Sequence, residues 1–317
     1  MALLELKELK VHFPQKSGWF GPKRCVKAVD GVSLTLEPGE IIGLVGESGC
    51  GKSTLGRAAV NLERPTSGDV LIDGVDLYKA PAPQIRRLCG RYQMIFQDPY
   101  GSLNPRLTVF SALDEVLSMR KEKFSSAERK ALAGELLERV GLGADAMSRF
   151  PHQFSGGQRQ RIGIARALAA DPGFIVADEP VSALDVSVQA AIVNLLQEIR
   201  ENLGTAFLFI AHDLAVVEHI SDRIMVMYLG NVVESAPAKE LIDDPRHPYS
   251  RALLSAVPSL KKKSERIILK GDVPSPLDPP RGCPFHPRCP YAAEICRSAK
   301  PELKKNGSHA VACFMRD

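Results

Sequence analysis

The sequence predicts an α/β fold: a mostly parallel sheet with an inserted helical subdomain and a Cys- and Pro-rich C-terminal extension. Three observations predict it. Short apolar runs alternate with stretches of helical spacing up to about Pro245, a helical stretch is inserted before the apolar run at 174–177, and prolines and cysteines crowd the end of the chain. Because buried strands that are separated by helices are covered on both faces, they pair mostly in parallel.

The first buried strand is expected at Ile41–Val45, an apolar run that ends in a glycine-rich turn, and helical character follows at 52–60. The pattern is again helical from 109 to about 140, where Ser125 or Ser126 can cap a helix. Its apolar residues Leu132, Leu136, Leu137 and Val140 fall on one face. Further strands are expected at 70–72, 94–96, 174–177, 207–210 and 224–228, and a further helix at 186–203.

These elements divide the chain into a first domain at 1–245, with the helical subdomain at about 98–165, and an extension at 246–317. Hydrophobic residues make up 44% and charged residues 25% of the 317 residues, which is ordinary for a soluble globular protein. The net charge of +4 is too small to indicate a nucleic-acid partner. No apolar run approaches the roughly 18 residues that span a bilayer. If the protein serves a membrane process, another chain is therefore expected to supply the membrane part.

One glycine-rich segment predicts a phosphate-binding loop. Residues 46–53 match the pattern G-x-x-x-x-G-K-[ST] between a strand and a helix. In such a loop the backbone N–H groups point at phosphate oxygens, the lysine lies by the β- and γ-phosphates, and the serine hydroxyl binds Mg²⁺. A glycine turn with a surface lysine is the alternative. The expected ATP-binding residues here are Gly46, Glu47, Ser48, Gly49, Cys50, Gly51, Lys52, Ser53 and Thr54.

Two acids at the end of the apolar strand 174–177 predict hydrolytic chemistry. Asp178 is expected to hold Mg²⁺, and Glu179 to orient or deprotonate the attacking water. The alternative is a carboxylate pair that caps a helix. His212 follows the apolar strand 207–210 and is expected to position the water, because ligands bind at the carboxyl edge of such sheets. A satisfied turn residue is the alternative for this histidine.

The segment from Phe154 to Arg161 closely resembles the signature sequence of ABC ATPases, and it precedes the acid pair by about 20 residues, as in that family. The resemblance implies that Ser155, Gly156, Gly157 and Gln158 cap the γ-phosphate held by a partner subunit. It also implies that Gln97 contacts Mg²⁺ and that Asp185, in the segment 182–185, lies at the dimer interface. The family stacks adenine on an aromatic residue near the first strand, which implies Phe13, with Trp19 or Phe20 as alternatives.

Three further stretches, at 97–105, 247–254 and 282–290, resemble the ATP-binding subunits of oligopeptide and dipeptide permeases. By that resemblance the chain pairs with a second, related ATP-binding subunit at the cytoplasmic face of the inner membrane. The pair sits under two transmembrane permease subunits that a solute-binding protein feeds. Nickel and glutathione importers share this layout and stay as alternatives. A soluble, nucleic-acid-remodelling ABC ATPase is disfavoured, because this chain has one cassette and no heptad array.

Four of the seven cysteines crowd the last 35 residues with the spacing C-x5-C-x6-C-x16-C: Cys283, Cys289, Cys296 and Cys313. Clustering of this kind in a reducing compartment indicates metal more than disulfides. Four thiolates can hold a 4Fe–4S cluster, which the resemblance to peptide permeases also implies. Zinc is the alternative, with His286 or His309 in place of a cysteine, although zinc sites usually contain C-x-x-C pairs. Plain structural cysteines are the third possibility.

Overall fold

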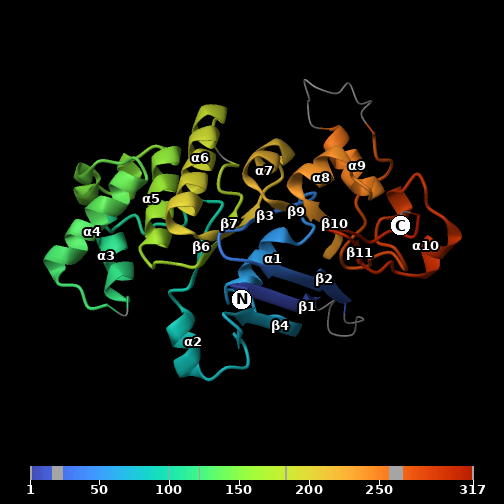
Figure 1. The fold of residues 1–317 in the computed structure, drawn as a ribbon, viewed down its shortest axis with the longest axis horizontal. Coiled ribbons are helices and arrows are strands. Elements are labelled where there is room, and N and C mark those ends of the chain that lie inside the picture. Colours follow the sequence, from blue (N-terminus) through green and yellow to red (C-terminus); the bar gives the residue numbers. More distant parts are fainter. Residues whose placement is uncertain are drawn as a thin grey trace. The chain divides into compact units, whose positions relative to one another are not determined.

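The computed structural model describes residues 2–15, 24–98, 100–120, 122–182, 184–256 and 267–315. The chain forms two compact units. Unit 1 consists of Met1–Leu36, Ile41–Tyr78 and Phe209–Asp317, and unit 2 consists of Glu37–Glu40 and Lys79–Leu208. Each unit has its own buried core. Figure 1 shows the helices and strands in chain order from blue to red.

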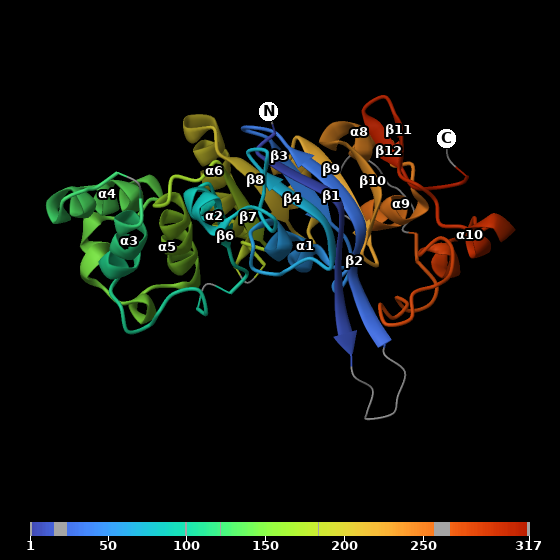
Figure 2. The same cartoon turned by 90° about the horizontal axis from the view of Figure 1, so that it is seen from below.

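An antiparallel sheet in unit 1 joins β1 (Leu4–Gln15) to β2 (Arg24–Leu36) and to β4 (Ser67–Ile72), with the two-residue strand β5 (Val75–Asp76) at the edge. Figure 2 shows β1 and β2 side by side along their length. Of this sheet, only the apolar part of β4, at 70–72, is predicted from the sequence. In β1 the alternation of buried and exposed side chains is interrupted, because Glu8 has φ 45° at a register shift. The buried positions therefore change from Leu4 and Leu6 to Leu9 and Val11.

A second sheet in unit 1 is mixed. Strand β3 (Ile41–Val45) runs parallel to β9 (Arg223–Tyr228), whereas β10 (Asn231–Pro237) is antiparallel to β9. The C-terminal strand β12 (His309–Val311) pairs with β10, and β11 (Lys304–Asn306) pairs with β12. The helices of this unit include α1 (Lys52–Ala59), α7 (Leu214–Ile220) and α8 (Ala238–Asp243). The expectation of a mostly parallel sheet therefore needs correction, because short hairpin connections such as the one after β9 reverse the strand direction.

Unit 2 carries the helices of the inserted segment. Strands β6 (Tyr92–Ile95) and β7 (Phe174–Asp178) are parallel, and β8 (Ala206–Ile210) runs from unit 2 into unit 1. The helices α3 (Val109–Ser118), α4 (Ser126–Arg139) and α5 (Gly156–Leu168) pack against one another (Figure 1). The unit also contains α2 (Ala82–Leu88), α6 (Val186–Leu203) and the 3-10 turns Ala144–Ser148 and Pro151–Gln153.

The helical pattern predicted from 109 to 140 forms two helices, and Ser125 is the cap of the second. Its hydroxyl accepts the Glu128 N–H at 3.3 Å, and the Glu128 carboxylate accepts the Ser125 N–H at 2.7 Å. This reciprocal pair satisfies two donors at the helix start. The helix predicted at 186–203 and the strand predicted at 41–45 have those bounds in the structure.

The segment after residue 245 contains short elements in its described part. They are α9 (Pro248–Ser255), the 3-10 turn η3 (His286–Arg288), α10 (Glu294–Ser298) and the strands β11 and β12. The prolines there remove backbone donors and fix φ, which limits the length of helices and strands. The domain boundaries at 245 and at 98–165 stay predictions. Over the described residues, no helix combines the length and the apolar character that a membrane crossing requires.

Candidate functional site

The loop between β3 and α1 needs glycine at two positions. Gly51 has φ 105°, and a Cβ there would lie 1.9 Å from the carbonyl oxygen of Ala28. Gly46 has φ 155°, and its Cβ would lie 2.2 Å from the carbonyl oxygen of Met227. Any side chain at either position would collide with neighbouring backbone. The loop therefore packs closely on β2 and β9, a conformation that suits the cradle predicted at 46–53.

Lys52 turns its ammonium group into this loop. Its Nζ donates to the carbonyl oxygens of Gly46 at 2.8 Å and Glu47 at 3.1 Å, and the side chain is buried. A full positive charge is thus fixed at the start of α1, where the helix dipole adds partial positive charge. Burial raises the pKa of the neighbouring Cys50 thiol, which keeps this cysteine neutral and unreactive.

Glu47 has partners that the motif does not predict. Its backbone N–H donates to the Tyr249 hydroxyl at 2.8 Å, and its carboxylate accepts from the Arg288 guanidinium at 2.7 and 3.2 Å. Tyr249 lies in the stretch 247–254 and Arg288 in the stretch 282–290, both of which carry the resemblance to peptide permeases. Those stretches were the available signal, but sequence alone does not reveal what each side chain contacts.

In unit 2 the predicted acids lie at the carboxyl ends of neighbouring strands. Asp178 ends β7 and is almost fully buried, and Glu179 follows it with φ 46°. Because Ile95 of β6 stands opposite Ala177 of β7, the residues after both strands meet at one edge. There Gln97 Nε2 donates to Glu179 Oε2 at 3.0 Å. The structure therefore brings the predicted glutamine and the predicted base into direct contact.

The signature segment starts helix α5 with a capping box. Ser155 accepts the Gln158 N–H at 3.3 Å, and the Gln158 amide oxygen accepts the Ser155 N–H at 3.0 Å. A Cβ on Gly157 would lie 2.5 Å from Cγ1 of Val188 on α6, so the second glycine allows the two helices to approach. The helix start therefore presents backbone donors near Gly156, which is the arrangement that binds anions.

Asp185 caps α6. Its Oδ1 accepts the Ser187 hydroxyl at 2.7 Å and the Val188 N–H at 2.9 Å, and these two bonds hold the carboxyl pKa below its ordinary value. The neighbouring Val186 is 81% exposed. A single exposed apolar residue is ordinary at a protein surface, so the dimer interface expected at Asp185 stays a prediction. Ala183, in the same predicted segment, lies outside the described residues.

The remaining predicted residues lie in unit 1. His212 follows β8 and precedes α7, as the sequence order requires. Phe13 lies opposite Val26 in the β1–β2 pair and is 38% exposed, so its ring is accessible for stacking. Trp19 and Phe20, the alternatives for the adenine contact, lie outside the described residues. Lys52 and His212 thus belong to unit 1, and the acids, Gln97 and the signature helix belong to unit 2.

The four C-terminal cysteines share one region of unit 1. Cys283 and Cys296 are buried, and burial raises the pKa of Cys283 to about 11, with the charges of the other three thiols adding to the effect. Among the described residues, however, no group of three or more His, Cys, Asp or Glu side chains is placed to hold a metal ion. The 4Fe–4S cluster and the zinc site therefore stay predictions.

The two histidines named as alternative zinc ligands have other partners. His286 Nδ1 lies 2.9 Å from the carbonyl oxygen of Cys283. His309 is fully buried, with Nε2 2.6 Å from Glu234 and Nδ1 3.1 Å from Glu240. Both ring nitrogens of His309 are thus engaged by carboxylates, which argues against this residue as a zinc ligand.

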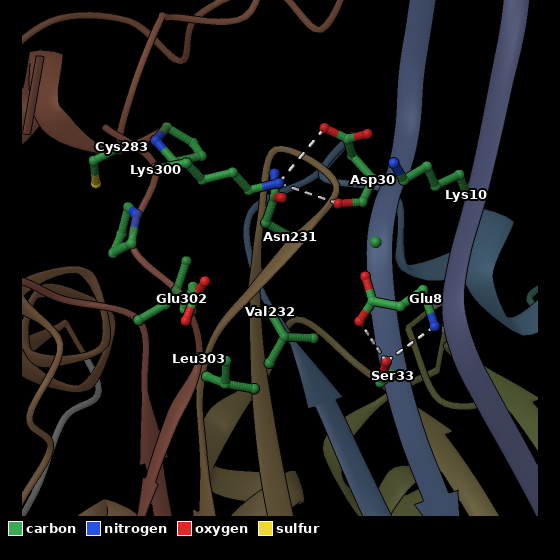
Figure 3. Close-up of a pocket in the computed structure, with 15 residues that line it drawn as sticks. Glu8, Lys10, Asp30, Ser33, Asn231, Val232, Cys283, Lys300, Glu302 and Leu303 are labelled. Atoms are coloured by element: carbon green, nitrogen blue, oxygen red, sulfur yellow. Dashed lines mark hydrogen bonds and ion pairs between the residues drawn. The ribbon is translucent and has the colours of Figure 1, made fainter. Parts of the chain in front are cut away.

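A pocket of about 520 Å³ in unit 1 is lined by residues of β1, β2, β10 and the C-terminal extension, and Figure 3 draws these side chains. Lys300 reaches across it to Asp30, where its Nζ lies 3.2 Å from the backbone oxygen and 3.6 Å from the carboxylate (Figure 3). Glu8 and Ser33 form a second polar pair in this pocket. No residue of the loop 46–53 lines it, so the pocket is separate from the predicted phosphate site.

Comparisons with known proteins agree with these motifs. Residues 29–182 match the family described as ABC transporter, and residues 233–296 match the family described as oligopeptide/dipeptide transporter, C-terminal region. The oligopeptide transport ATP-binding protein AppF of Bacillus subtilis is 52% identical over 320 residues, which cover 99% of this chain and 97% of that protein. The dipeptide transport ATP-binding protein DppF of Escherichia coli is 50% identical over 319 residues, with 99% and 95% covered.

A similar fold is found among solved structures. A dimeric ATP-binding cassette in a post-hydrolysis state, bound to ADP and Pi, has a TM-score of 0.65 and 30% identity to this chain. The match covers 74% of this chain and 98% of that chain. The uncovered quarter of this chain shows that it contains more than the cassette itself.

Proposed function

Because the chain belongs to the ABC transporter ATP-binding proteins of the oligopeptide and dipeptide type, we propose that it hydrolyses ATP to power peptide import through membrane-embedded partners. One observation carries the proposal: a complete set of ATPase motifs stands in the same chain as the C-terminal region typical of peptide transporters. Relatives that are named as oligopeptide or dipeptide transport ATP-binding proteins match it over nearly its whole length.

The residues of the site support ATP hydrolysis by the following roles. Lys52 contacts the terminal phosphates, and Glu179 takes a proton from the attacking water, with His212 holding that water in place. The hydrogen bond from Gln97 to Glu179 keeps the carboxylate oriented before the water binds. Mg²⁺ would be held by Ser53, Asp178 and Gln97, hydroxyl and carbonyl or carboxylate oxygen ligands that suit this ion, and it neutralises phosphate charge when bound.

Several finer assignments complete the proposal. The signature helix that Ser155 caps binds the triphosphate held by a second, related ATP-binding subunit, so that two nucleotides lie between two chains. The pair works at the cytoplasmic face of the inner membrane with two permease subunits and, indirectly, a solute-binding protein. The division into a nucleotide-binding domain at 1–245 and a C-terminal extension at 246–317 belongs to the same proposal. The missing membrane-spanning helix among the described residues is compatible with a peripheral subunit.

A glutamate substitution tests the hydrolytic assignment. Glu179→Gln removes the base while it keeps a side chain of the same size, so we expect ATP binding to persist and turnover to fall by about 10²–10⁴-fold. Glu201→Gln, on an exposed position of α6, is the matched control and should keep the parent rate. Turnover of Glu179→Gln at the parent rate would rule out Glu179 as the base.

A transport assay tests the substrate class. The chain is reconstituted in proteoliposomes with its permease subunits and binding protein, and ATP-dependent uptake of a radiolabelled tripeptide is measured. We expect uptake that Lys52→Ala abolishes, because the phosphate contact is lost. ATP-dependent uptake of Ni²⁺ or glutathione, with no tripeptide uptake, would instead assign the chain to a nickel or glutathione importer.

The four clustered cysteines are included as a 4Fe–4S site. Support comes from their number, their thiol chemistry and their shared region of unit 1. Anaerobically purified protein should absorb near 400 nm and contain iron and sulfide, and Cys283→Ser should remove both. The exposed Cys89 gives the control variant Cys89→Ser. A colourless protein that contains zinc would support the alternative metal, and a metal-free protein would support structural cysteines.

A further inference from the structure

A residue of the C-terminal extension contacts the phosphate-binding loop directly. Arg288 Nη1 and Nη2 donate to the two carboxylate oxygens of Glu47 at 2.7 and 3.2 Å. The pair is bidentate, and the side chains are only 8% and 28% exposed for Arg288 and Glu47. Parallel two-point bonding of this kind is the strongest and most directional form of ion pair that arginine makes.

The position of Glu47 gives this pair its meaning. It is the residue after Gly46, inside the loop that is built to attract phosphate, and its backbone oxygen accepts from the Lys52 ammonium at 3.1 Å. A carboxylate at this place would repel a triphosphate and would compete with it for Lys52. Arg288 neutralises the carboxylate and keeps it on the side of the extension. The loop thereby retains its positive character.

The same loop residue is held a second time. The Glu47 backbone N–H donates to the Tyr249 hydroxyl at 2.8 Å, and the Tyr249 ring lies 5.4 Å from that of Phe285 in the extension. Phe285 is 1% exposed and also packs edge-on against Tyr228, 5.3 Å between centroids. Since Phe285 and Arg288 are three residues apart, one rigid segment of the extension supports both contacts to Glu47.

We propose that Arg288 is a positioning residue for nucleotide binding: it neutralises and orients Glu47, so that the C-terminal extension sets the affinity of the phosphate-binding loop for ATP. The inference rests on the proposed ATP-binding function and adds that the C-terminal extension regulates the affinity for ATP. The extension acts through Arg288 on the loop, and Arg288 itself need not touch the nucleotide.

The ATP affinities of two variants distinguish charge neutralisation by Arg288 from a purely structural contact. Arg288→Ala leaves a bare carboxylate in the loop and should weaken ATP binding about tenfold, the size expected for one uncompensated charge near a polyanion at the protein surface. Adding Glu47→Gln removes that charge, so the double variant should return to within about threefold of the parent. A purely structural contact predicts no recovery of ATP affinity in the double variant, because the second substitution removes yet another contact.

The experiment measures ATP dissociation constants of the full chain by isothermal titration calorimetry in the Glu179→Gln background, with thermal unfolding recorded for every variant. Arg281→Ala, an exposed arginine of the same extension, is the control and should bind as the parent does. Arg288→Lys keeps the charge without the two-point geometry and should fall between the parent and Arg288→Ala. Glu47→Gln alone leaves the Arg288 charge uncompensated beside the loop and should tighten ATP binding by up to about tenfold, which tests the same reasoning should Arg288→Ala fail to fold.

The outcomes are distinct. Parent-like ATP binding by Arg288→Ala overturns the inference, as does a double variant that binds no better than Arg288→Ala. A Glu47→Gln variant that loses ATP tenfold also overturns it, since the carboxylate would then be needed. Failure of the parent background itself to bind ATP would refute the proposed function and the inference together, whereas the other results leave the proposed function in place.

Discussion

Removal of the His309 imidazole should detach the C-terminal extension from β10 more often, because it leaves a fully buried carboxylate without its imidazole partner. Glu234 and His309 are both 0% exposed and lie 2.6 Å apart. Glu234 also accepts the backbone N–H groups of Arg246 at 2.6 Å and His247 at 3.0 Å. Breaking a buried pair by deleting one partner costs about 3–5 kcal/mol. The two backbone donors remain in His309→Ala, so we expect the lower end, about 3 kcal/mol.

That free energy corresponds to an approximately 100-fold larger population of the open extension. Limited proteolysis under native conditions reports this population when closing is faster than cleavage. We therefore expect His309→Ala to be cut within residues 267–315 about 100 times faster than the parent, at equal protease concentration.

The matched control is His12→Ala. His12 also contacts a carboxylate, Asp30, at 3.0 Å, but both side chains are about one-fifth exposed. Exposed pairs of this kind contribute about 0–1 kcal/mol, so cleavage should rise less than about fivefold. A second variant, His309→Leu with Glu234→Gln, removes the buried charge while the amide oxygen still accepts one of the two backbone donors, and it should recover part of the protection. Equal cleavage rates for His309→Ala and His12→Ala would refute the reasoning.

Three further predictions concern glycines of the signature helix and a buried histidine. Gly157→Ala should destabilise unit 2, since its Cβ would lie 2.5 Å from Val188 Cγ1, and Val188→Ala should rescue it in urea unfolding; no rescue would contradict this contact. Gly163→Ala, in the same helix, adds a Cβ that meets nothing within 4 Å and should instead raise the free energy of unfolding by about 0.5–1 kcal/mol, and a lower urea midpoint would count against it. Burial lowers the pKa of His247 from 6.5 to about 3, so the unfolded chain binds a proton below pH 6.5 that the folded chain does not. Stability should thus fall as pH drops from about 6.5 towards 3, by about 1.4 kcal/mol between pH 7.5 and 5.5, and His247→Asn should flatten this slope; equal slopes would refute it.

The elements with a single buried environment were predictable from the sequence. Strand β3 and helix α6 have the predicted bounds because a short apolar run and a long 3.6-residue period each have one stable arrangement. Strand β1 was missed although it alternates, because the register shift at Glu8 breaks the period. Local pattern rules assume an uninterrupted period, so bulges are their characteristic failure.

The candidate site divides in the same way. Gln97 and Glu179 were predicted from their places after apolar strands, and the parallel pairing of β6 with β7 explains their contact. Arg288 and Tyr249 were not predicted as loop partners. Their contacts to Glu47 join residues more than 200 positions apart, and no local period encodes such a pairing.

The attachment of the extension argues that it folds with the core of unit 1. Strand β12 pairs with β10, Lys300 reaches Asp30, and His309 shares a buried bond with Glu234. The two side-chain contacts contribute differently to stability. Lys300 makes an exposed ion pair that contributes little, whereas His309 makes a buried pair that is costly to break. The buried bond therefore fixes the extension in place. The same extension holds Glu47 through Arg288. Loss of the His309 contact should therefore also weaken the Arg288–Glu47 ion pair at the phosphate-binding loop.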